Sequence, residues 1–249
     1  MISKNQIKLI NQLGQKKIRL REGLFVAEGP KIVGDLLKRW TPKAVFSTSD
    51  YSPTLPLQIQ TVTEDELRRI SFLQHPQQVL ALFPIPSPST LHLPPSTLIL
   101  ALDGIQDPGN LGTIIRVADW FGIDHIVCSE DTADAWNPKV VQATMGSIAR
   151  VNLTYTDLPA FIDQLPADFP IYGTLLDGDN IYQQPLSARG LIVMGNEGNG
   201  LSAAVRLRIT HRLLIPSARY GDTAESLNVA IATAIVCSEF RRTHPTTRQ

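Results

Sequence analysis

The strongest constraint on the fold is a series of short apolar runs in the C-terminal part of the chain. Six runs lie between residues 97 and 216 and alternate with helical stretches: TLILAL, HIVCS, RVNLTY, IYGTL, LIVMG and RLLIP. Strands that are apolar throughout are typical of parallel sheets with helices on both faces. The pattern therefore predicts an α/β fold with a mainly parallel sheet flanked by helices. Ligands of such sheets collect beyond the carboxyl ends of the strands.

A proline-rich stretch divides the chain. Residues 84–96, PIPSPSTLHLPPS, would stay extended and stiff, which predicts a linker between a unit at 1–83 and a larger domain at 97–249. The first unit has the pattern of a small α/β domain. Its expected elements are a basic helical start, a helix over 28–40, short strands at 44–48 and 79–83, and a helix opened by Thr63.

The segment LIVMGNEGNGLS, residues 191–202, leads from an apolar run into a glycine-rich turn. Its glycines, Gly195, Gly198 and Gly200, do not have the spacing of a dinucleotide fingerprint, and Glu197 would repel a phosphate. We therefore expect a ligand that is neutral or cationic at this point. The alternative is that Glu197 only caps a helix that starts near Leu201.

A second polar loop follows the first apolar run, in DGIQDPGNLGTIIRVADWFGID, residues 103–124. Asn110 is expected to be the N-cap of a helix, with Arg116 pointing away from the sheet toward its carboxyl edge. There Arg116 could contact a phosphate or a sugar hydroxyl, or it could be a surface arginine paired with Asp119 or Asp107. The positions expected to face the sheet are Leu111, Ile114, Ile115 and Ala118.

The third stretch is a helix near the C-terminus that is apolar on nearly every side from Leu227 to Val236. Such a helix should be buried both by the sheet and by something else, for example a partner subunit. Ser226 and Asn228, at its entrance, would bond either nearby backbone or the ligand. Another helical stretch, at 137–151, contains Lys139, which could face a phosphate or solvent, and Gly146, a natural C-terminal cap.

The charges are balanced overall, at 23 basic and 23 acidic side chains, but not locally. Six basic residues and no acid lie within the first 21 residues, which suits either RNA phosphate or a solvated helix face. Cys128 and Cys237 have neither disulfide nor metal-ligand spacing and are expected in the core. No signal-like or membrane-length apolar stretch occurs, which predicts a cytoplasmic protein with no membrane and no metal.

In order and spacing these motifs resemble the SpoU (TrmH-like) family of RNA ribose 2′-O-methyltransferases, within the SPOUT superfamily. DPGNLGTIIRVADWFG is similar to the first family motif, LIVMGNEGNGLS to the second and ESLNVAIATAI to the third, with NPKVVQATMGSIARV as a further similar segment. The resemblance covers residues 98–240. Residues 1–83 also resemble the ribosomal-protein-like RNA-binding domain that many members carry.

The resemblance implies a C-terminal trefoil knot, S-adenosylmethionine as cofactor, an RNA substrate and a homodimer that pairs through the third-motif helix. It implies a catalytic group of Arg116, Asn110, Glu197, Ser226 and Asn228. It implies cofactor contacts from Gly195, Asn196, Ile215, Leu227, Thr174 and Leu175. The RNA-binding positions that we expect are Lys4, Lys8, Lys16, Lys17, Arg19 and Arg21.

The expected function is therefore S-adenosylmethionine-dependent methylation of a ribose 2′-hydroxyl, in ribosomal RNA because of the separate N-terminal domain. Two alternatives stay open: a tRNA ribose methyltransferase, and a non-catalytic RNA-binding or ribosome-assembly factor with the same fold. The sequence departs from the family pattern between Pro216 and Ser226, where the loop is a few residues longer than usual. The longer loop would change the adenine pocket of the cofactor site or the entry to it.

Overall fold

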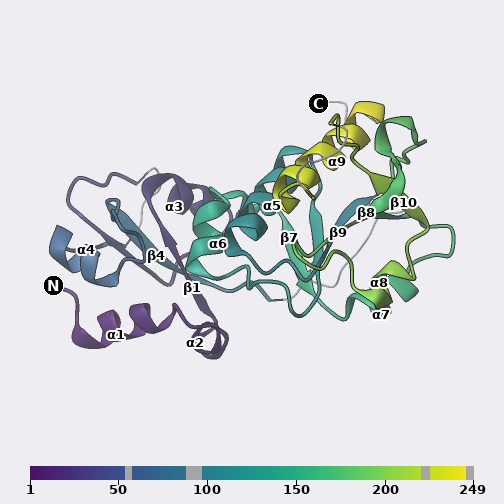
Figure 1. Cartoon of the computed structure of the whole chain (residues 1–249). Coiled ribbons are helices and arrows are strands. Elements are labelled where there is room, and N and C mark those ends of the chain that lie inside the picture. Colours follow the sequence, from purple (N-terminus) through teal and green to yellow (C-terminus); the bar gives the residue numbers. More distant parts are fainter. Residues whose placement is uncertain (54–57, 88–96, 220–224, 245–249) are drawn as a thin grey trace. The chain divides into compact units, whose positions relative to one another are not determined.

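The computed structural model describes residues 1–53, 58–87, 97–219 and 225–244 (Figure 1). Two compact units make up the chain. The first contains Met1–Ser87 together with Asp134–Arg150, and the second contains Pro88–Ala133 together with Val151–Gln249. The chain therefore enters the first unit twice, which the sequence analysis did not anticipate.

The second unit is built on a six-stranded sheet in which every neighbouring pair of strands is parallel. The strand order is β10-β8-β9-β5-β6-β7. This confirms the predicted mainly parallel sheet, and each predicted run forms one strand. The strands are β5 (Leu98–Asp103), β6 (His125–Cys128), β7 (Asn152–Tyr155), β8 (Ile171–Asn180), β9 (Gly190–Gly195) and β10 (His211–Leu214).

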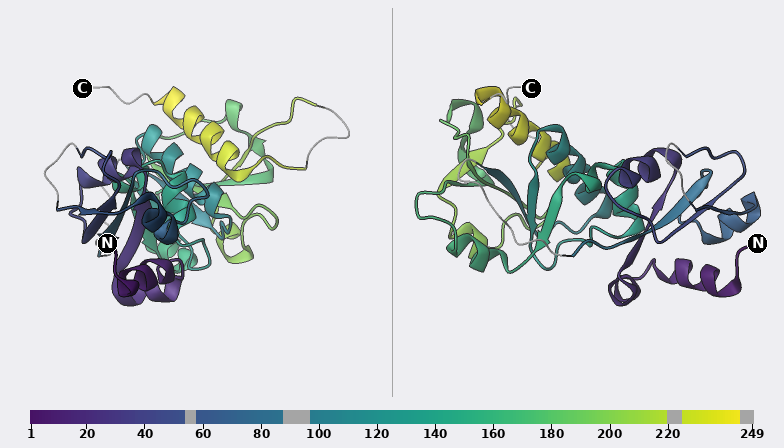
Figure 2. Two further views of the ribbon diagram at one scale, coloured as in Figure 1. Left: turned by 90° about the vertical axis from the view of Figure 1, so that its left-hand side faces the viewer. Right: turned by 180° about the vertical axis from the view of Figure 1, so that it is seen from behind.

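Helices cover both faces of this sheet (Figures 1 and 2). On one face, α7 (Leu158–Asp163) and α8 (Ala203–Arg206) pack on side chains such as Ile99, Val127 and Val193. The other face carries α5 (Pro108–Trp120) and α9 (Val229–Thr243), which contact each other. The predicted sheet-facing side of α5 is confirmed, because Leu111, Ile114, Ile115 and Ala118 are fully buried.

Both cysteines lie in the core of this unit, as predicted. Cys128 and Cys237 are free thiols and fully enclosed. Burial raises the pKa of the Cys128 thiol well above its usual range and that of Cys237 to about 12. Both thiols are therefore neutral packing groups. Within the described ranges, no helix is long and apolar enough to cross a membrane.

The first unit has a four-stranded sheet with the order β1-β4-β2-β3. β4 is antiparallel to both of its neighbours, and β3 is parallel to β2. Its strands are β1 (Leu24–Glu28), β2 (Ala44–Ser47), β3 (Gln60–Thr61) and β4 (Val79–Pro84). Its helices are α1 (Lys4–Gln12), α2 (Lys16–Glu22), α3 (Pro30–Leu37), α4 (Glu64–Ile70) and α6 (Pro138–Ala143), with short helical turns at Ser147–Ala149 here and at Ile181–Gln183 in the second unit.

β1 was not predicted, and the helix predicted over 28–40 begins only at Pro30. Gly29 has φ of 88°, which breaks the chain between strand and helix, and Pro30 then occupies the first helical turn. The helix at Thr63 is confirmed, since Thr63 and Glu66 form a reciprocal capping box at the start of α4.

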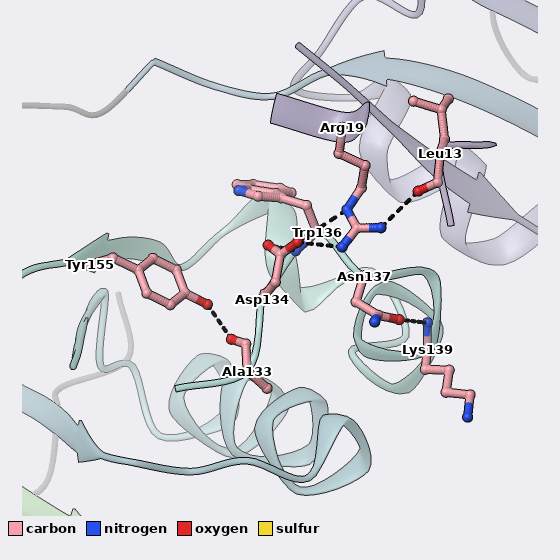
Figure 3. Close-up of polar contacts among 8 residues, drawn as sticks. All are labelled: Leu13, Arg19, Ala133, Asp134, Trp136, Asn137, Lys139 and Tyr155. Atoms are coloured by element: carbon pink, nitrogen blue, oxygen red, sulfur yellow. Dashed lines mark hydrogen bonds and ion pairs between the residues drawn. The ribbon is translucent and has the colours of Figure 1, made fainter. Parts of the chain in front are cut away.

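Residues 134–150 complete the core of the first unit (Figure 3). Trp136 packs against Phe25, with ring centroids 4.9 Å apart, and against Trp40 at 6.1 Å. Gly146 has φ of 94° and lies so close to Asp35 that a Cβ atom there would be 2.7 Å from the carboxylate. We had predicted that Gly146 ends α6, and this prediction is wrong. The helix ends at Ala143, and Gly146 admits the side chain of Asp35 instead.

Candidate active site

The candidate site lies at the carboxyl edge of the parallel sheet, where the strand order reverses. From β5 the chain continues to β6 on one side, whereas β9 lies on the other side. Loops that leave neighbouring strands in opposite directions create a crevice in open α/β sheets. The first and second sequence motifs occupy the loops after β5 and β9.

The loop after β9 is a tight turn that depends on Gly195 and Asn196. A Cβ atom on Gly195 would lie 2.5 Å from the carbonyl carbon of Gly200, so only glycine fits. The Asn196 side-chain oxygen accepts hydrogen bonds from the backbone N–H groups of Gly198 and Asn199, at 2.9 and 3.0 Å. Asn196 therefore shapes the turn from inside.

Two further contacts tie this loop to the loop after β5. The Asn196 amide nitrogen donates to the carbonyl oxygen of Gly104 at 2.6 Å. The buried carboxylate of Asp103 accepts from the backbone N–H of Ser202 at 2.6 Å. Ser202 is also the N-cap of α8, so Glu197 does not cap that helix. The alternative that Glu197 only caps the helix near Leu201 is therefore wrong, and its side chain has a different partner.

Glu197 and Asn228 meet at Asn110, so that one side chain joins all three motifs. The Asn110 amide nitrogen donates to a carboxylate oxygen of Glu197 at 2.8 Å. Its carbonyl oxygen accepts from the Asn228 amide at 2.9 Å. These residues are 87 and 118 positions away from Asn110 in the sequence. Their convergence is therefore a property of the fold.

The predicted N-cap of α5 was wrong. Asp107 fills that position, because its side chain accepts from the Asn110 N–H at 2.8 Å and Pro108 occupies the first turn. The Asn110 side chain is thereby left available for its two partners. Asn228 does cap α9, through its side-chain oxygen to the N–H groups of Ala230 and Ile231, and its amide nitrogen still reaches Asn110.

Arg116 lies on α5 with its side chain exposed. It forms no ion pair or side-chain hydrogen bond with any residue that the structure describes. The expected alternative, pairing with Asp107 or Asp119, is therefore not observed. A guanidinium group that keeps all its donors available can bind phosphate in a bidentate manner.

The other expected cofactor residues lie on the sheet's last strands and at the entrance of α9. Thr174 and Leu175 belong to β8, where the Thr174 hydroxyl donates to the carbonyl of Val193 at 3.2 Å. Ile215 directly follows β10 and is half-buried. Ser226 and Leu227 precede α9 and are exposed. Residues 220–224 of the enlarged loop lie outside the described part of the chain.

The expected RNA-binding positions are exposed except for one. Arg19 is 1% exposed and lies inside the first unit (Figure 3). Its guanidinium pairs with Asp134 at 2.5 Å and donates to the Leu13 carbonyl at 2.7 Å. It has no donors left on a surface that RNA could reach, so Arg19 is removed from the set. The exposed members are Lys4, Lys8, Lys16, Lys17 and Arg21.

Two positioning residues were missed by the sequence analysis. Asp103 ends β5 and holds the neighbouring loop, as described above. Ser129, after β6, accepts a hydrogen bond from the Gly104 N–H at 2.8 Å and contacts Asp131 at 2.6 Å. Polar residues that immediately follow buried strands were the available signal, because these positions lie at the ligand-binding edge.

The chemistry of this edge suits a cationic ligand. The two loops offer backbone groups, asparagine amides and the carboxylate of Glu197, and the close approach at Gly195 leaves no side chain there. S-Adenosylmethionine carries a positive sulfonium and no phosphate, so these residues fit it better than they fit a dinucleotide. In the described ranges, no group of three or more metal-binding side chains is clustered.

Comparison with known proteins identifies the family. Residues 97–238 match the model of the SpoU rRNA Methylase family, and residues 4–81 match that of the MRM3-like substrate binding domain. The chain is 35% identical to the 23S rRNA (guanosine(2553)-2′-O)-methyltransferase RlmP of Bacillus subtilis, over 96% of this chain and 97% of that protein.

Solved structures agree. A TrmH-family protein from Porphyromonas gingivalis superposes with a TM-score of 0.88 at 41% identity, covering 98% of this chain and 99% of that one. An AdoMet-bound rRNA methyltransferase from Sinorhizobium meliloti gives a TM-score of 0.85 at 31% identity, covering 99% of this chain and 98% of that one. The chain therefore belongs to the SpoU rRNA methylase family, as its motifs had predicted.

Proposed function

We propose that this SpoU-family enzyme transfers a methyl group from S-adenosylmethionine to a ribose 2′-hydroxyl of ribosomal RNA. The reaction class and the cofactor follow from family membership. The observation that carries the assignment is the junction at Asn110, which joins Glu197 and Asn228 on the helix that also carries Arg116, an arginine without a partner among the described residues. A ribosomal substrate is supported by the RlmP relative, whose name specifies 23S rRNA.

Arg116 has the central role in this proposal. Methyl transfer needs the 2′-hydroxyl held close to the reactive carbon, and positioning of this kind can supply several kcal/mol, up to about 7–11 in favourable cases. A guanidinium is a planar cation with five N–H donors, so Arg116 would clamp the neighbouring phosphate and polarise the hydroxyl. The bound cofactor would supply the electrophilic methyl group.

The asparagine junction would keep this arginine effective. Asn110 and Asn228 are neutral, and Glu197 is held by the Asn110 amide at 2.8 Å. In the described part of the chain, this carboxylate has the Asn110 amide as its hydrogen-bond partner and forms no ion pair with Arg116. We assign Glu197, Asn196 and the backbone of Gly195, Ile215 and Leu227 to the cofactor side. Thr174, Leu175 and Ser226 complete the proposed set.

We further propose that the active form is a homodimer paired through α9. Leu227 and Ile231, at the start of this helix, are 50% and 53% exposed although both are large and apolar. Clustered exposed apolar side chains favour a partner surface. The substitution Ile231→Asp should then produce a monomer in light scattering. A wild-type protein that is monomeric at assay concentration would contradict this part of the proposal.

The first unit would supply RNA affinity through Lys4, Lys8, Lys16, Lys17 and Arg21, in line with its match to a substrate binding domain. We also propose the trefoil knot of the SPOUT superfamily in the second unit, on the basis of family membership alone. The substrate would place the enzyme with ribosomes in the cytoplasm.

The test is transfer of radiolabelled methyl groups from S-adenosylmethionine to unmodified ribosomal RNA and to tRNA, separated by size. Label in one ribosomal RNA, confined to a ribose, would support the proposal. Label in tRNA alone would replace the substrate with the first alternative. Cofactor binding without label in either RNA would favour the second alternative, a non-catalytic RNA-binding factor.

A further inference from the structure

A cavity in the first unit is not used by the proposed reaction. Its volume is about 280 Å³, and all of its lining residues belong to that unit. Apolar walls come from Val26 and Val141, and an aromatic ring comes from Phe72. Three side chains with hydrogen-bonding groups also line it: Glu28, Lys139 and Gln142.

Glu28 is the unusual member of this lining. It ends β1, is 5% exposed, and has no ion-pair partner among the residues that the structure describes. Its carboxylate accepts hydrogen bonds from the Ser71 hydroxyl and from the Phe72 N–H, the latter at 2.8 Å. These two bonds fix the loop after α4. Burial raises the pKa of Glu28 above its ordinary value, because two neutral donors do not fully replace water.

The carboxylate still has capacity to accept. Two carboxylate oxygens offer about four acceptor positions, of which the protein fills two. A ligand that brings N–H donors to this edge of the cavity would therefore stabilise the buried group. A ligand that presents only acceptors there would destabilise it.

The remaining lining groups suit the rest of a flat aromatic ligand. Phe72 is 38% exposed, and its ring edge packs against Gly14, where a Cβ atom would lie 2.9 Å from the ring. Lys139 is exposed and can donate, and Gln142 can donate or accept. Planar bases stack on aromatic side chains and are bound through their polar edges.

We propose that this cavity binds an unpaired guanine base. Guanine presents two adjacent N–H donors on its Watson–Crick edge, which match the Glu28 carboxylate, and two acceptors on its other edge, which match Lys139 and Gln142. Adenine and cytosine place a ring acceptor beside their amino group, which would face the carboxylate. Uracil has one ring N–H, flanked by carbonyl oxygens.

The guanine could belong to an RNA loop or to a free guanine nucleotide. The assignment of the base to an RNA rests on the proposed function. The binding of a guanine by the cavity does not depend on that function. We propose RNA as the source, because the unit matches a substrate binding domain and carries the exposed lysines.

The experiment measures equilibrium binding of the full-length protein to an RNA hairpin with one unpaired guanosine in its loop. Matched hairpins carry inosine or adenosine at that position, and guanosine 5′-monophosphate is titrated separately. We expect affinity to fall about 3- to 10-fold with inosine, which lacks the amino donor, and more than about 10-fold with adenosine. Micromolar binding of the free nucleotide would support the same site with a nucleotide as the source.

Variants of the lining residues test whether the preference for guanosine arises in this cavity. Glu28→Gln should remove the preference for guanosine, and Lys139→Ala should weaken guanosine binding several-fold. Lys38→Ala is the matched control, because Lys38 is exposed in the same unit and pairs with Asp35 outside the cavity. If Glu28→Gln does not fold, Ala143→Phe fills the cavity without removing a polar group and should have the same effect.

Equal affinity for the three hairpins, together with no binding of the nucleotide, would overturn the proposal. So would a guanosine preference that survives both Glu28→Gln and Ala143→Phe. Methyl incorporation by the wild-type protein is measured in parallel. If no methyl group is incorporated, the proposed function is contradicted, and the base-binding result still stands. If methyl groups are incorporated but the hairpins bind equally, only the proposal for the cavity is contradicted.

Discussion

Two arginines, one in each unit, occupy opposite environments. Arg19 of α2 is buried, pairs with Asp134 and donates to a backbone carbonyl. Arg116 of α5 is exposed and makes no ion pair with any described residue. Both follow from the same chemistry, because a guanidinium is always charged and carries five donors. A buried guanidinium such as that of Arg19 needs a carboxylate to balance its charge. A guanidinium that is to bind a substrate phosphate, as proposed for Arg116, needs its donors free.

The comparison separates two uses of polar groups. The first unit pairs its buried arginine with Asp134 and thereby fixes a chain segment that is distant in sequence. The second unit joins the loops of its candidate site through asparagine amides, and its Glu197 carboxylate bonds Asn110 and forms no ion pair with Arg116. Stability and reactivity are thus assigned to different arginines.

The largest effect is expected from Arg116→Ala. Removing a donor that acts in the transition state typically costs about 10²- to 10³-fold in rate. We expect methyl transfer to fall by this factor or more, with S-adenosylmethionine affinity changed by less than about 2-fold. Arg116→Lys should also fail, because an ammonium cannot form the bidentate contact. Single-turnover methyl transfer and calorimetric cofactor titration measure the two quantities.

Arg189→Ala is the control for Arg116. Arg189 pairs with Asp168 and precedes β9, so it lies at the end of the sheet away from the site. It should leave turnover within about 2-fold, as expected of an exposed ion pair. Equal losses of turnover in the Arg116 and Arg189 variants would show that Arg116 has no special role in the reaction.

Arg19→Met tests the structural role of the buried arginine. It leaves Asp134 and the Leu13 carbonyl without their partner inside the first unit, and breaking a buried pair costs about 3–5 kcal/mol. Thermal and urea unfolding should show this loss. The double variant Arg19→Met with Asp134→Asn should lose less than the sum of the single variants. Arg21→Ala, whose exposed pair with Glu22 is worth less than about 1 kcal/mol, is the control.

A smaller effect is expected at the turn after β9. Gly195→Ala places a Cβ atom 2.5 Å from Gly200, and relieving such a clash costs about 1–3 kcal/mol. We expect S-adenosylmethionine affinity to fall about 10-fold. Gly198→Ala meets only the Asn196 side-chain oxygen at 3.7 Å and should bind the cofactor normally. A normal affinity in the Gly195 variant would remove this turn from the cofactor site.

The smallest effect is expected from the exposed lysines of the first unit. Replacing Lys16 or Lys17 by alanine should lower RNA affinity a few-fold and reduce the slope of log affinity against log salt by about one unit each, if each contacts a phosphate. Binding of a duplex RNA at several salt concentrations measures the slope. An unchanged slope would show that these lysines form only a solvated helix face.

The parallel sheet was predictable because strands buried on both faces leave continuous apolar runs in the sequence. The candidate site was predictable in part for a similar reason, since its polar residues directly follow those strands. Glu197 and Asn228 lie 87 and 118 positions from Asn110, and no local pattern encodes such distances, so only the resemblance to the family grouped these three residues.

The errors have local physical causes. Asn110 was a reasonable cap, but Asp107 followed by Pro108 provides a better helix start. Arg19 looked like its exposed neighbours because charge patterns do not reveal burial. Its partner Asp134 is 115 positions away, in a stretch that belonged by sequence to the other domain.

That second entry of the chain into the first unit also sets an order of synthesis. A nascent chain that has reached the proline-rich stretch at 84–96 already contains Arg19 and Phe25, but not yet Asp134 or Trp136. The part of the first unit's core around Arg19 and Phe25 can therefore close only after β5, α5 and β6 have been made. For the same reason, a fragment cut at this stretch leaves a buried arginine without its counterion. A transplanted N-terminal unit needs residues 134–150 to travel with it.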